Sequence, residues 1–194
     1  MKIIFFDLET QYLFKELNMI SNVDRDPSKL KIAIAGVRMD GNSIFFNENQ
    51  ITELIQCLKD ADLIVGHNLL RFDYFVLQPY INKNFIESLK SKTFDIMFEL
   101  EKVTGCWTSL DDLGKRNLGM TKTIDTLKIP KMWRDGQHQE VKDYLSNDLI
   151  MTEAIFNHGK DVGKFKYEYK EYGISKGQRE VIIDWKNMKA KKGL

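Results

Sequence analysis

Residues 2–10, KIIFFDLET, combine a short apolar strand with two acids. Apolar residues occupy both alternating faces of this stretch, which is typical of a strand that helices cover on both sides of a sheet. Asp7 and Glu9 are two residues apart, so both carboxylates project from the same face. Because ligand sites of α/β sheets gather beyond the carboxyl ends of strands, this stretch predicts a site at its end.

The remainder of the chain alternates strands with helices. A turn signal at residues 39–42 separates two alternating stretches and predicts a hairpin. Ser109 is the expected N-cap of a later helix, and Gly119 its stop. This order of elements predicts an α/β sheet with helices on both faces. We expect strands at residues 30–38, 43–46, 62–65 and 93–95, and helices at residues 49–60, 72–80, 109–119 and 137–156.

Two long segments, residues 11–29 and residues 120–136, follow neither period and are predicted to be loops. Loops of this length in a compact domain are usually functional or mobile. We therefore expect that either segment could flank a site.

The composition excludes several classes of protein. With 194 residues, 43% hydrophobic and 29% charged, the chain is neither collagenous nor wholly disordered, and it fits one domain or one domain with an appendage. No apolar stretch reaches the roughly 18 residues that span a bilayer, and the first apolar run is too short for a signal peptide. Cys57 and Cys106 lie far apart, which predicts neither a zinc site nor a disulfide framework, but a thiol-reduced cytoplasmic protein with no membrane partner.

The net charge of +1 hides an asymmetry. Residues 160–194 hold 10 Lys and Arg and 5 Asp and Glu, which leaves 19 and 23 for residues 1–159. The asymmetry favours an acidic site with a basic surface beside it, and a solvated extension is the alternative. We expect one domain over residues 1–160 and a basic C-terminal extension over residues 161–194, packed on the same domain.

Two further acids follow the same logic. Asp73 comes after the strand at residues 62–65, at a matching sheet edge, and stabilisation of a helix start is its alternative role. Asp148 falls inside the apolar stripe of the last helix, one turn after Tyr144. A carboxylate there is costly unless it is paired or bound to a metal, so a salt bridge to a Lys or Arg elsewhere is the alternative. For Asp7 and Glu9 the alternative is an acidic strand end that meets solvent.

Four acids without a His or Cys cluster favour Mg²⁺ or Mn²⁺ over zinc. Two such ions, roughly 3.5–4 Å apart, activate a water and stabilise the leaving oxygen in phosphodiester hydrolysis. The candidate ligands for two divalent cations are Asp7, Glu9, Asp73 and Asp148.

Three motifs carry a family resemblance. Residues 6–10 (FDLET), 68–73 (NLLRFD) and 144–148 (YLSND) resemble, in this order, the motifs of the DEDD superfamily of 3′–5′ exonucleases. With Tyr144 four residues before Asp148, the third motif resembles that of the tyrosine branch (DEDDy). The histidine branch would carry His at position 143, where this chain has Asp. Residues 109–119 and 132–137 also look like microbial ribonuclease-H-like exonuclease domains, some of which are fused to helicases. The resemblance covers residues 1–160.

This resemblance implies an RNase-H-like three-layer α/β/α fold with a central mixed sheet. It implies a 3′–5′ exonuclease that hydrolyses single-stranded or frayed DNA or RNA with two Mg²⁺ or Mn²⁺ ions, and it makes a helicase a candidate partner. Tyr144 would orient the attacking water, since a tyrosine with a pKa of about 10 is a poor general base. By motif match the metal ligands, which with Tyr144 form the catalytic set, are Asp7, Glu9, Asp73 and Asp148; the residues that contact the terminal nucleotide are Thr10, Asn68 and Phe72.

Two other functions stay open: a non-catalytic module that binds nucleic acid or a helicase, and an RNase H-type endonuclease. In the tail, residues 164–170 interleave cations with aromatics, which suits phosphates and stacked bases, or else an edge strand whose lysines block aggregation. For an enzyme, Asp7→Ala or Asp148→Ala should abolish turnover and leave the fold intact, because either change relieves repulsion in a crowded anionic site.

Overall fold

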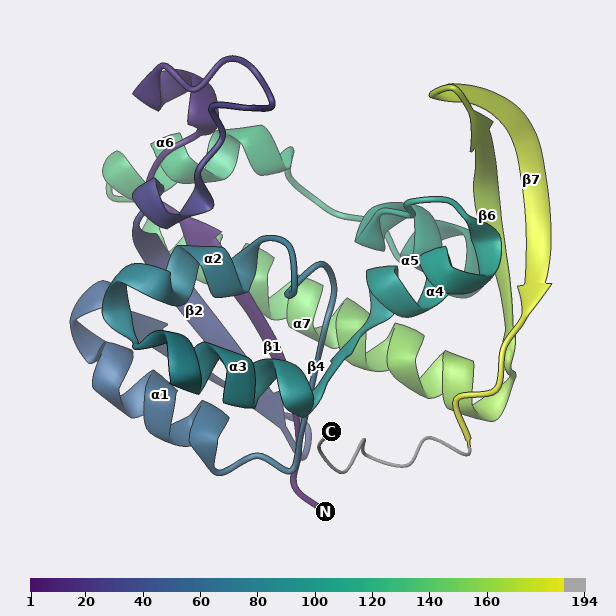
Figure 1. The fold of residues 1–194 in the computed structure, drawn as a ribbon, viewed down its shortest axis with the longest axis horizontal. Helices are drawn as coiled ribbons and strands as arrows, with labels where there is room; N and C mark the ends of the chain where they lie inside the picture. The colour runs from purple at the N-terminus through teal and green to yellow at the C-terminus, as the bar shows by residue number, and fades with distance from the viewer. Residues whose placement is uncertain (187–194) are drawn as a thin grey trace.

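A mixed five-stranded sheet lies at the centre of the protein, between two layers of helices (Figure 1). It is seen in a computed structural model that describes residues 1–186, so the tail lysines at 189, 191 and 192 lie outside the described residues. The strand order is β3-β2-β1-β4-β5; β1 and β4 pair in parallel, as do β4 and β5, whereas β2 pairs antiparallel with β1 and β3. The fold is thus the expected RNase-H-like three-layer α/β/α fold. The strands are β1 (Ile3–Thr10), β2 (Ile32–Met39), β3 (Asn42–Asn47), β4 (Leu63–Gly66) and β5 (Thr93–Asp95).

Each face of the sheet has its own helices and its own hydrophobic core. The helices on one face are α1 (Ile51–Lys59), α2 (Asp73–Leu77) and α3 (Lys83–Ser91). Those on the other are α4 (Ile96–Thr104), α5 (Leu110–Leu118), α6 (Ile129–Arg134) and α7 (His138–Asp161), the last of which runs along the sheet (Figure 1). Among residues 1–186, no helix combines the length and the apolar character needed to cross a membrane.

Strand β1 assigns its side chains to the two cores in alternation. Phe6 and Leu8 pack with the layer of α1–α3, whereas Phe5 packs with the layer of α7. Asp7 and Glu9 are in step with Phe5, because side chains two residues apart in a strand share a face. Both carboxylates therefore face the layer that contains α7.

Most elements lie where their local pattern predicts. The hairpin of β2 and β3 forms, and the final helix is confirmed as α7, although it continues to Asp161. The Ser109 side chain accepts a hydrogen bond from Asp112 N at the start of α5, and Gly119 ends that helix with φ 68°. A positive φ is easiest for glycine, so the stop signal is physically required there.

The loop predictions are wrong in part. Residues 120–136 contain a 3₁₀ turn, Thr126–Lys128, followed directly by α6. Pro130 lies in the first turn of α6, where its missing N–H costs nothing, so here it begins a helix rather than breaking one. Residues 11–29 contain two further 3₁₀ turns, Phe14–Leu17 and Pro27–Lys29.

A second, two-stranded sheet lies beside α5 (Figure 1). It consists of β6 (Lys164–Glu171) and β7 (Ile174–Ile182), so the strand interpretation of this segment is confirmed. The Asn117 side chain on α5 bonds both Lys166 N and Lys166 O, at 2.8 and 2.9 Å. Phe165 and Tyr167 are buried. The expectation that these two aromatics stack on bases is therefore wrong, because both are buried and Phe165 belongs to the hydrophobic core.

Helix α7 approaches β2 closely at Gly36. A Cβ atom at this position would lie 2.7 Å from Leu149 Cδ1 and 3.2 Å from Leu145 Cδ2. These two leucines flank Asp148 on α7. The absence of a side chain at Gly36 therefore lets α7 carry Asp148 close to the sheet.

We expect Gly36→Val to lower the free energy of unfolding by about 1–3 kcal/mol, because the added methyl groups would overpack this contact. Urea denaturation measures the change. Ile44→Val on β3 is the control, since Ile44 is 51% exposed and the change should stay within about 0.5 kcal/mol. Equal stability of the two variants would show that β2 and α7 tolerate a wider spacing.

Candidate active site

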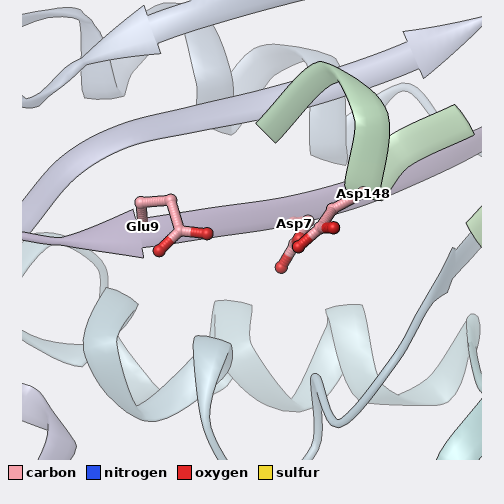
Figure 2. Close-up of side chains that lie close together, drawn as sticks. All are labelled: Asp7, Glu9 and Asp148. Atoms are coloured by element: carbon pink, nitrogen blue, oxygen red, sulfur yellow. The ribbon is translucent and has the colours of Figure 1, made fainter. Parts of the chain in front are cut away.

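Three carboxylates meet between the central strand and the long helix. Asp7 and Glu9 project from β1, and Asp148 descends toward them from α7 (Figure 2). Each offers one oxygen atom, and these three atoms all lie within 4.8 Å of one another. Glu9 and Asp148 are buried, so the alternative of an acidic strand end in solvent does not hold for Glu9. We call these three residues the acid cluster.

Asp73 lies beside the acid cluster without belonging to it. It is the first residue of α2 and is buried, and its Oδ1 accepts a hydrogen bond from Leu8 N at 3.2 Å. That bond reaches across to β1, so the side chain ties the helix start to the central strand. The structure thus brings three of the four predicted ligands into one group and places the fourth on the wall of the same cavity.

A lysine that was not among the predicted residues sits in the site. Lys122 Nζ forms an ion pair with Asp148 Oδ2 and donates a hydrogen bond to the Tyr144 hydroxyl at 2.8 Å. The salt-bridge alternative for Asp148 is therefore present. Burial by itself lowers the pKa of Lys122, but the Asp148 charge and the Tyr144 hydroxyl outweigh it, so the pKa lies above its ordinary value. Lys122 is a permanent cation at the acid cluster.

This ion pair separates two substitutions that the sequence treats alike. Asp7→Ala removes one of several crowded negative charges. Asp148→Ala also leaves the largely buried ammonium group of Lys122 without its ion-pair partner, which is costly. The expectation that the fold is unaffected therefore applies to Asp7 and no longer to Asp148.

Tyr144, predicted to orient the attacking water, is buried beside the acid cluster. Its side chain is 1% exposed, and its hydroxyl lies 2.8 Å from both Lys122 Nζ and Thr126 Oγ1. Burial, and then the Asp148 charge, raise the pKa of Tyr144, so the phenol stays neutral. In this arrangement Tyr144 holds Lys122 in place, and Lys122 and Thr126 are the groups that line the cavity.

The acids of the site have raised pKa values, because they are buried and too little positive charge lies near them. Burial raises the pKa of Asp7 to about 7, with a further contribution from Asp148, while Lys122 and the Leu8 N–H act in the opposite direction. Burial also raises the pKa of Glu9, as do the charges of Asp7 and Asp148. Burial and the Asp7 charge likewise raise the pKa of Asp73. Grouped carboxylate oxygens with this surplus of negative charge fit a hard divalent cation.

A cavity of about 350 Å³ opens above the acid cluster. Both segments predicted to flank a site contribute to it, residues 11–29 with Phe14 and residues 120–136 with Leu127 and Pro130. These residues form an apolar part of the cavity lining. Phe72 belongs to it, with its ring edge-on to Phe14 at a centroid distance of 6.3 Å.

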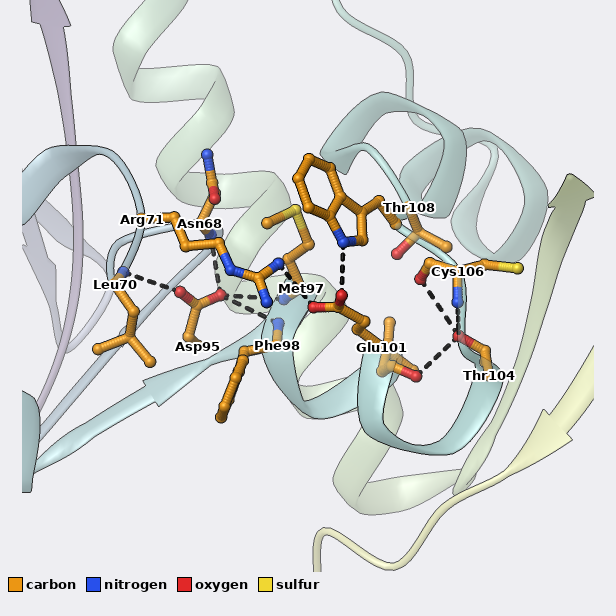
Figure 3. Close-up of polar contacts among 12 residues, drawn as sticks. Asn68, Leu70, Arg71, Asp95, Met97, Phe98, Glu101, Thr104, Cys106 and Thr108 are labelled. Atoms are coloured by element: carbon orange, nitrogen blue, oxygen red, sulfur yellow. Dashed lines mark hydrogen bonds and ion pairs between the residues drawn. The ribbon is translucent and has the colours of Figure 1, made fainter. Parts of the chain in front are cut away.

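The other predicted substrate residues also line this cavity. Thr10 is buried, and its hydroxyl donates to Tyr12 O at 3.0 Å. Asn68 adopts a left-handed backbone with φ 68° in the loop after β4. The buried carboxylate of Asp95 accepts hydrogen bonds from Asn68 N and Leu70 N in that loop, at 2.9 and 3.0 Å (Figure 3). Asp95 thereby positions Asn68 at the cavity.

Lys122 and Asp95 had little or no sequence signal. The requirement of Asp148 for a partner predicts a cation, but the chain has 29 Lys and Arg and no local pattern selects one. Asp95 is the N-cap of α4, because its side chain also accepts hydrogen bonds from Met97 N and Phe98 N. Its second role depends on the pairing of β4 with β5, which brings the loop after β4 next to it.

Comparisons with known proteins support the fold. No protein-family model and no curated protein sequence matches the chain. Among solved structures, it is similar to the family B DNA polymerase from the hyperthermophilic archaeon Pyrobaculum calidifontis, with a TM-score of 0.57 and 16% sequence identity. The match covers 81% of this chain and 24% of the polymerase chain, so this chain corresponds to about a quarter of that protein. At this identity the likeness concerns the fold.

The metal-free protein should lose stability as the pH rises. Asp7 has a pKa of about 7 in the folded state and an ordinary value of 3.8, so the folded state holds its proton more tightly than the unfolded state. Its contribution to stability is complete below about pH 4 and disappears as the pH rises through 7. Glu9 and Asp73, with raised pKa values, act in the same direction. Thermal unfolding in EDTA between pH 5 and 8 measures the effect.

In the same experiment Asp7→Asn should flatten the decline and raise the melting temperature at pH 8, because it removes one of the repelling charges. Added Mg²⁺ should stabilise the wild type more than this variant, since binding to the folded state adds stability. Asp143→Asn, at an exposed position of α7, is the matched control. An identical pH profile for all three proteins would contradict the charge shortage.

Proposed function

We propose that this protein is a metal-dependent 3′–5′ exonuclease that acts on single-stranded or frayed nucleic acid. The observation that carries the proposal is the position of the acid cluster in a cavity that apolar side chains, among them Phe14, Phe72 and Leu127, also line. The acids suit a phosphodiester and its metal ions, and the apolar side chains suit a nucleobase. The order of the three sequence motifs and the nuclease-like fold support the same conclusion.

The size of the cavity favours an exonuclease over an endonuclease of the RNase H type. About 350 Å³ is at the lower end of the range of small-ligand sites, roughly 300–1,000 Å³, and would accommodate a terminal nucleotide. The segments around Phe14 and Leu127 form part of its lining. A strand end can enter such a space, whereas a continuous hybrid would need an open groove. A helicase, the partner that the sequence resemblance implies, would supply such ends.

The donor set fits divalent metals. Asp7, Glu9 and Asp148 would hold one Mg²⁺ or Mn²⁺ ion, and Asp73 would complete a second position from the wall of the cavity. Bound divalent cations lower the pKa of a water and neutralise charge at the scissile phosphate. The acids themselves supply no proton transfer in this proposal; they would hold the metal ions that position the phosphate.

The remaining residues of the cavity have separate tasks. Lys122, a cation that lines the cavity, places positive charge next to the phosphate, and Tyr144 keeps its ammonium group oriented. Phe72 and Phe14 form an apolar surface against which the terminal base can pack. Thr10 and Asn68 line the same cavity and would contact the sugar of the terminal nucleotide.

Oligonucleotides labelled at the 3′ or 5′ end test the activity directly. With Mg²⁺ or Mn²⁺ we expect stepwise shortening from the 3′ end, loss of activity in EDTA, and no cleavage of a circular single strand. Binding without turnover in every metal would favour the non-catalytic module. Cleavage of the circle or of an internal hybrid would favour the endonuclease.

Asp7→Asn should reduce the rate by about 10²- to 10⁴-fold, since metal activation contributes several kcal/mol to the transition state. Single-turnover assays measure the loss. Asp143→Asn, on an exposed position next to Tyr144, removes the same charge outside the cavity and should keep the wild-type rate. Comparable losses in both variants would indicate a general effect of charge instead of a site.

A further inference from the structure

A second cavity, of about 630 Å³, adjoins the active-site cavity. His67 lines both, and at the start of α5 Leu110 lines the first while Asp111 lines the second. Asp111 also accepts a hydrogen bond from the backbone N–H of Lys122 at 2.7 Å, which ties the second cavity to the acid cluster. We call this second cavity the α5 pocket; its wall includes Trp107, Thr108, Asp111, Lys115, Arg116 and Lys170.

Trp107 is exposed at the α5 pocket and yet held in one orientation. Its side chain is 66% exposed, so burial does not explain its position. The indole Nε1 donates a hydrogen bond to Glu101 Oε1, and the Arg71 guanidinium lies over the ring, 5.0 Å from its centroid. Arg71 is itself ion-paired with Glu101 at 2.6 Å, and Figure 3 shows these two side chains together. Polar contacts therefore fix an open aromatic surface in advance of any ligand.

The α5 pocket also contains a polar group without a partner. Thr108 is 4% exposed, and its Oγ1 has no hydrogen-bond partner among residues 1–186. A buried hydroxyl left unpaired costs about 1–3 kcal/mol, so a ligand that supplies a partner gains affinity. The backbone carbonyl of Thr108 is engaged elsewhere, because it accepts from His67 Nε2 at 2.8 Å. The side-chain hydroxyl of Thr108, the residue next to Trp107, is thus left unpaired within the described part of the chain.

The charges in the α5 pocket largely cancel. Arg116 is ion-paired with Asp112 at 2.6 Å, and Lys170 with Glu168 at 2.9 Å. Lys115 is exposed and forms no ion pair within the part of the chain that the structure describes. The pocket therefore offers one available cation next to an aromatic surface. That combination favours a ligand held mainly by stacking, with one phosphate contact.

We propose that the α5 pocket binds a nucleotide of the substrate strand upstream of the terminal one, with its base stacked on Trp107. The inference rests on the proposed function, since a strand whose 3′ end occupies the active-site cavity must leave it, and the α5 pocket adjoins that cavity at His67. Stacking on an aromatic side chain tolerates every base, as a non-specific exonuclease requires. Lys115 would contact the phosphate, and Thr108 the sugar or base.

Binding of a fluorescent single-stranded hexanucleotide in EDTA tests the α5 pocket without any turnover. We expect Trp107→Ala to raise the Kd by about 5- to 150-fold, the range that corresponds to the loss of one stacked base, and Trp107→Phe to retain most of the affinity. Tyr172→Ala is the control, because Tyr172 is 98% exposed on the β6–β7 turn, away from the pocket wall. The loss should be nearly independent of salt, as expected for stacking in a near-neutral pocket.

A length series links the α5 pocket to the reaction. In the wild type the KM for a hexanucleotide should lie below that for a dinucleotide, whose upstream part does not extend far enough to stack on Trp107. Trp107→Ala should abolish most of this difference, and Tyr172→Ala should preserve it. An active wild type whose hexanucleotide affinity and KM are unchanged by Trp107→Ala would overturn the pocket proposal and leave the exonuclease in place; the indole would then serve a protein contact. Trp107-dependent binding without cleavage in any metal would overturn the exonuclease instead.

Discussion

Repulsion among Asp7, Glu9 and Asp148 is the constraint that the surrounding structure must overcome to hold these acids together. Three carboxylate oxygens within 4.8 Å of one another repel each other, and the ammonium group of Lys122 reduces this repulsion. The arrangement persists because its two supports are rigid: a central strand paired on both sides, and a 24-residue helix packed on the sheet. Gly36 lets that helix come close enough for the acids to meet.

The two walls of the active-site cavity come from different kinds of structure. The acids stand on β1, α2 and α7, which belong to the two hydrophobic cores. The apolar wall comes from short 3₁₀ turns and the start of α6, held together by the ion pair of Arg134 with Glu16 and by the Arg134 guanidinium over Tyr12. The charged groups thus stand on the long elements of the two cores, whereas the apolar lining rests on short surface segments.

The loop after β4 connects the two cavities. Asp95 fixes the backbone of this loop by accepting hydrogen bonds from Asn68 N and Leu70 N. Arg71, the loop residue after Leu70, lies over the ring of Trp107. His67, at the start of the same loop, lines both cavities. The motif around residues 68–73 therefore does more than supply one acid. Its Arg71 also holds Trp107, the aromatic surface over which, in our proposal, the strand leaves the active site.

Local pattern was sufficient for the strands, for most helices, and for the common face of Asp7 and Glu9, because strand period, caps and turn residues act over a few positions. It also identified Asp148 as a carboxylate in need of a partner. It could not select Lys122, 26 residues away in the sequence, nor show that Tyr144 contacts this lysine, nor that Phe165 is buried while Trp107 is exposed. Those features arise where α5, α7 and the segment before α6 pack against one another, and such contacts between distant residues leave no period in the sequence.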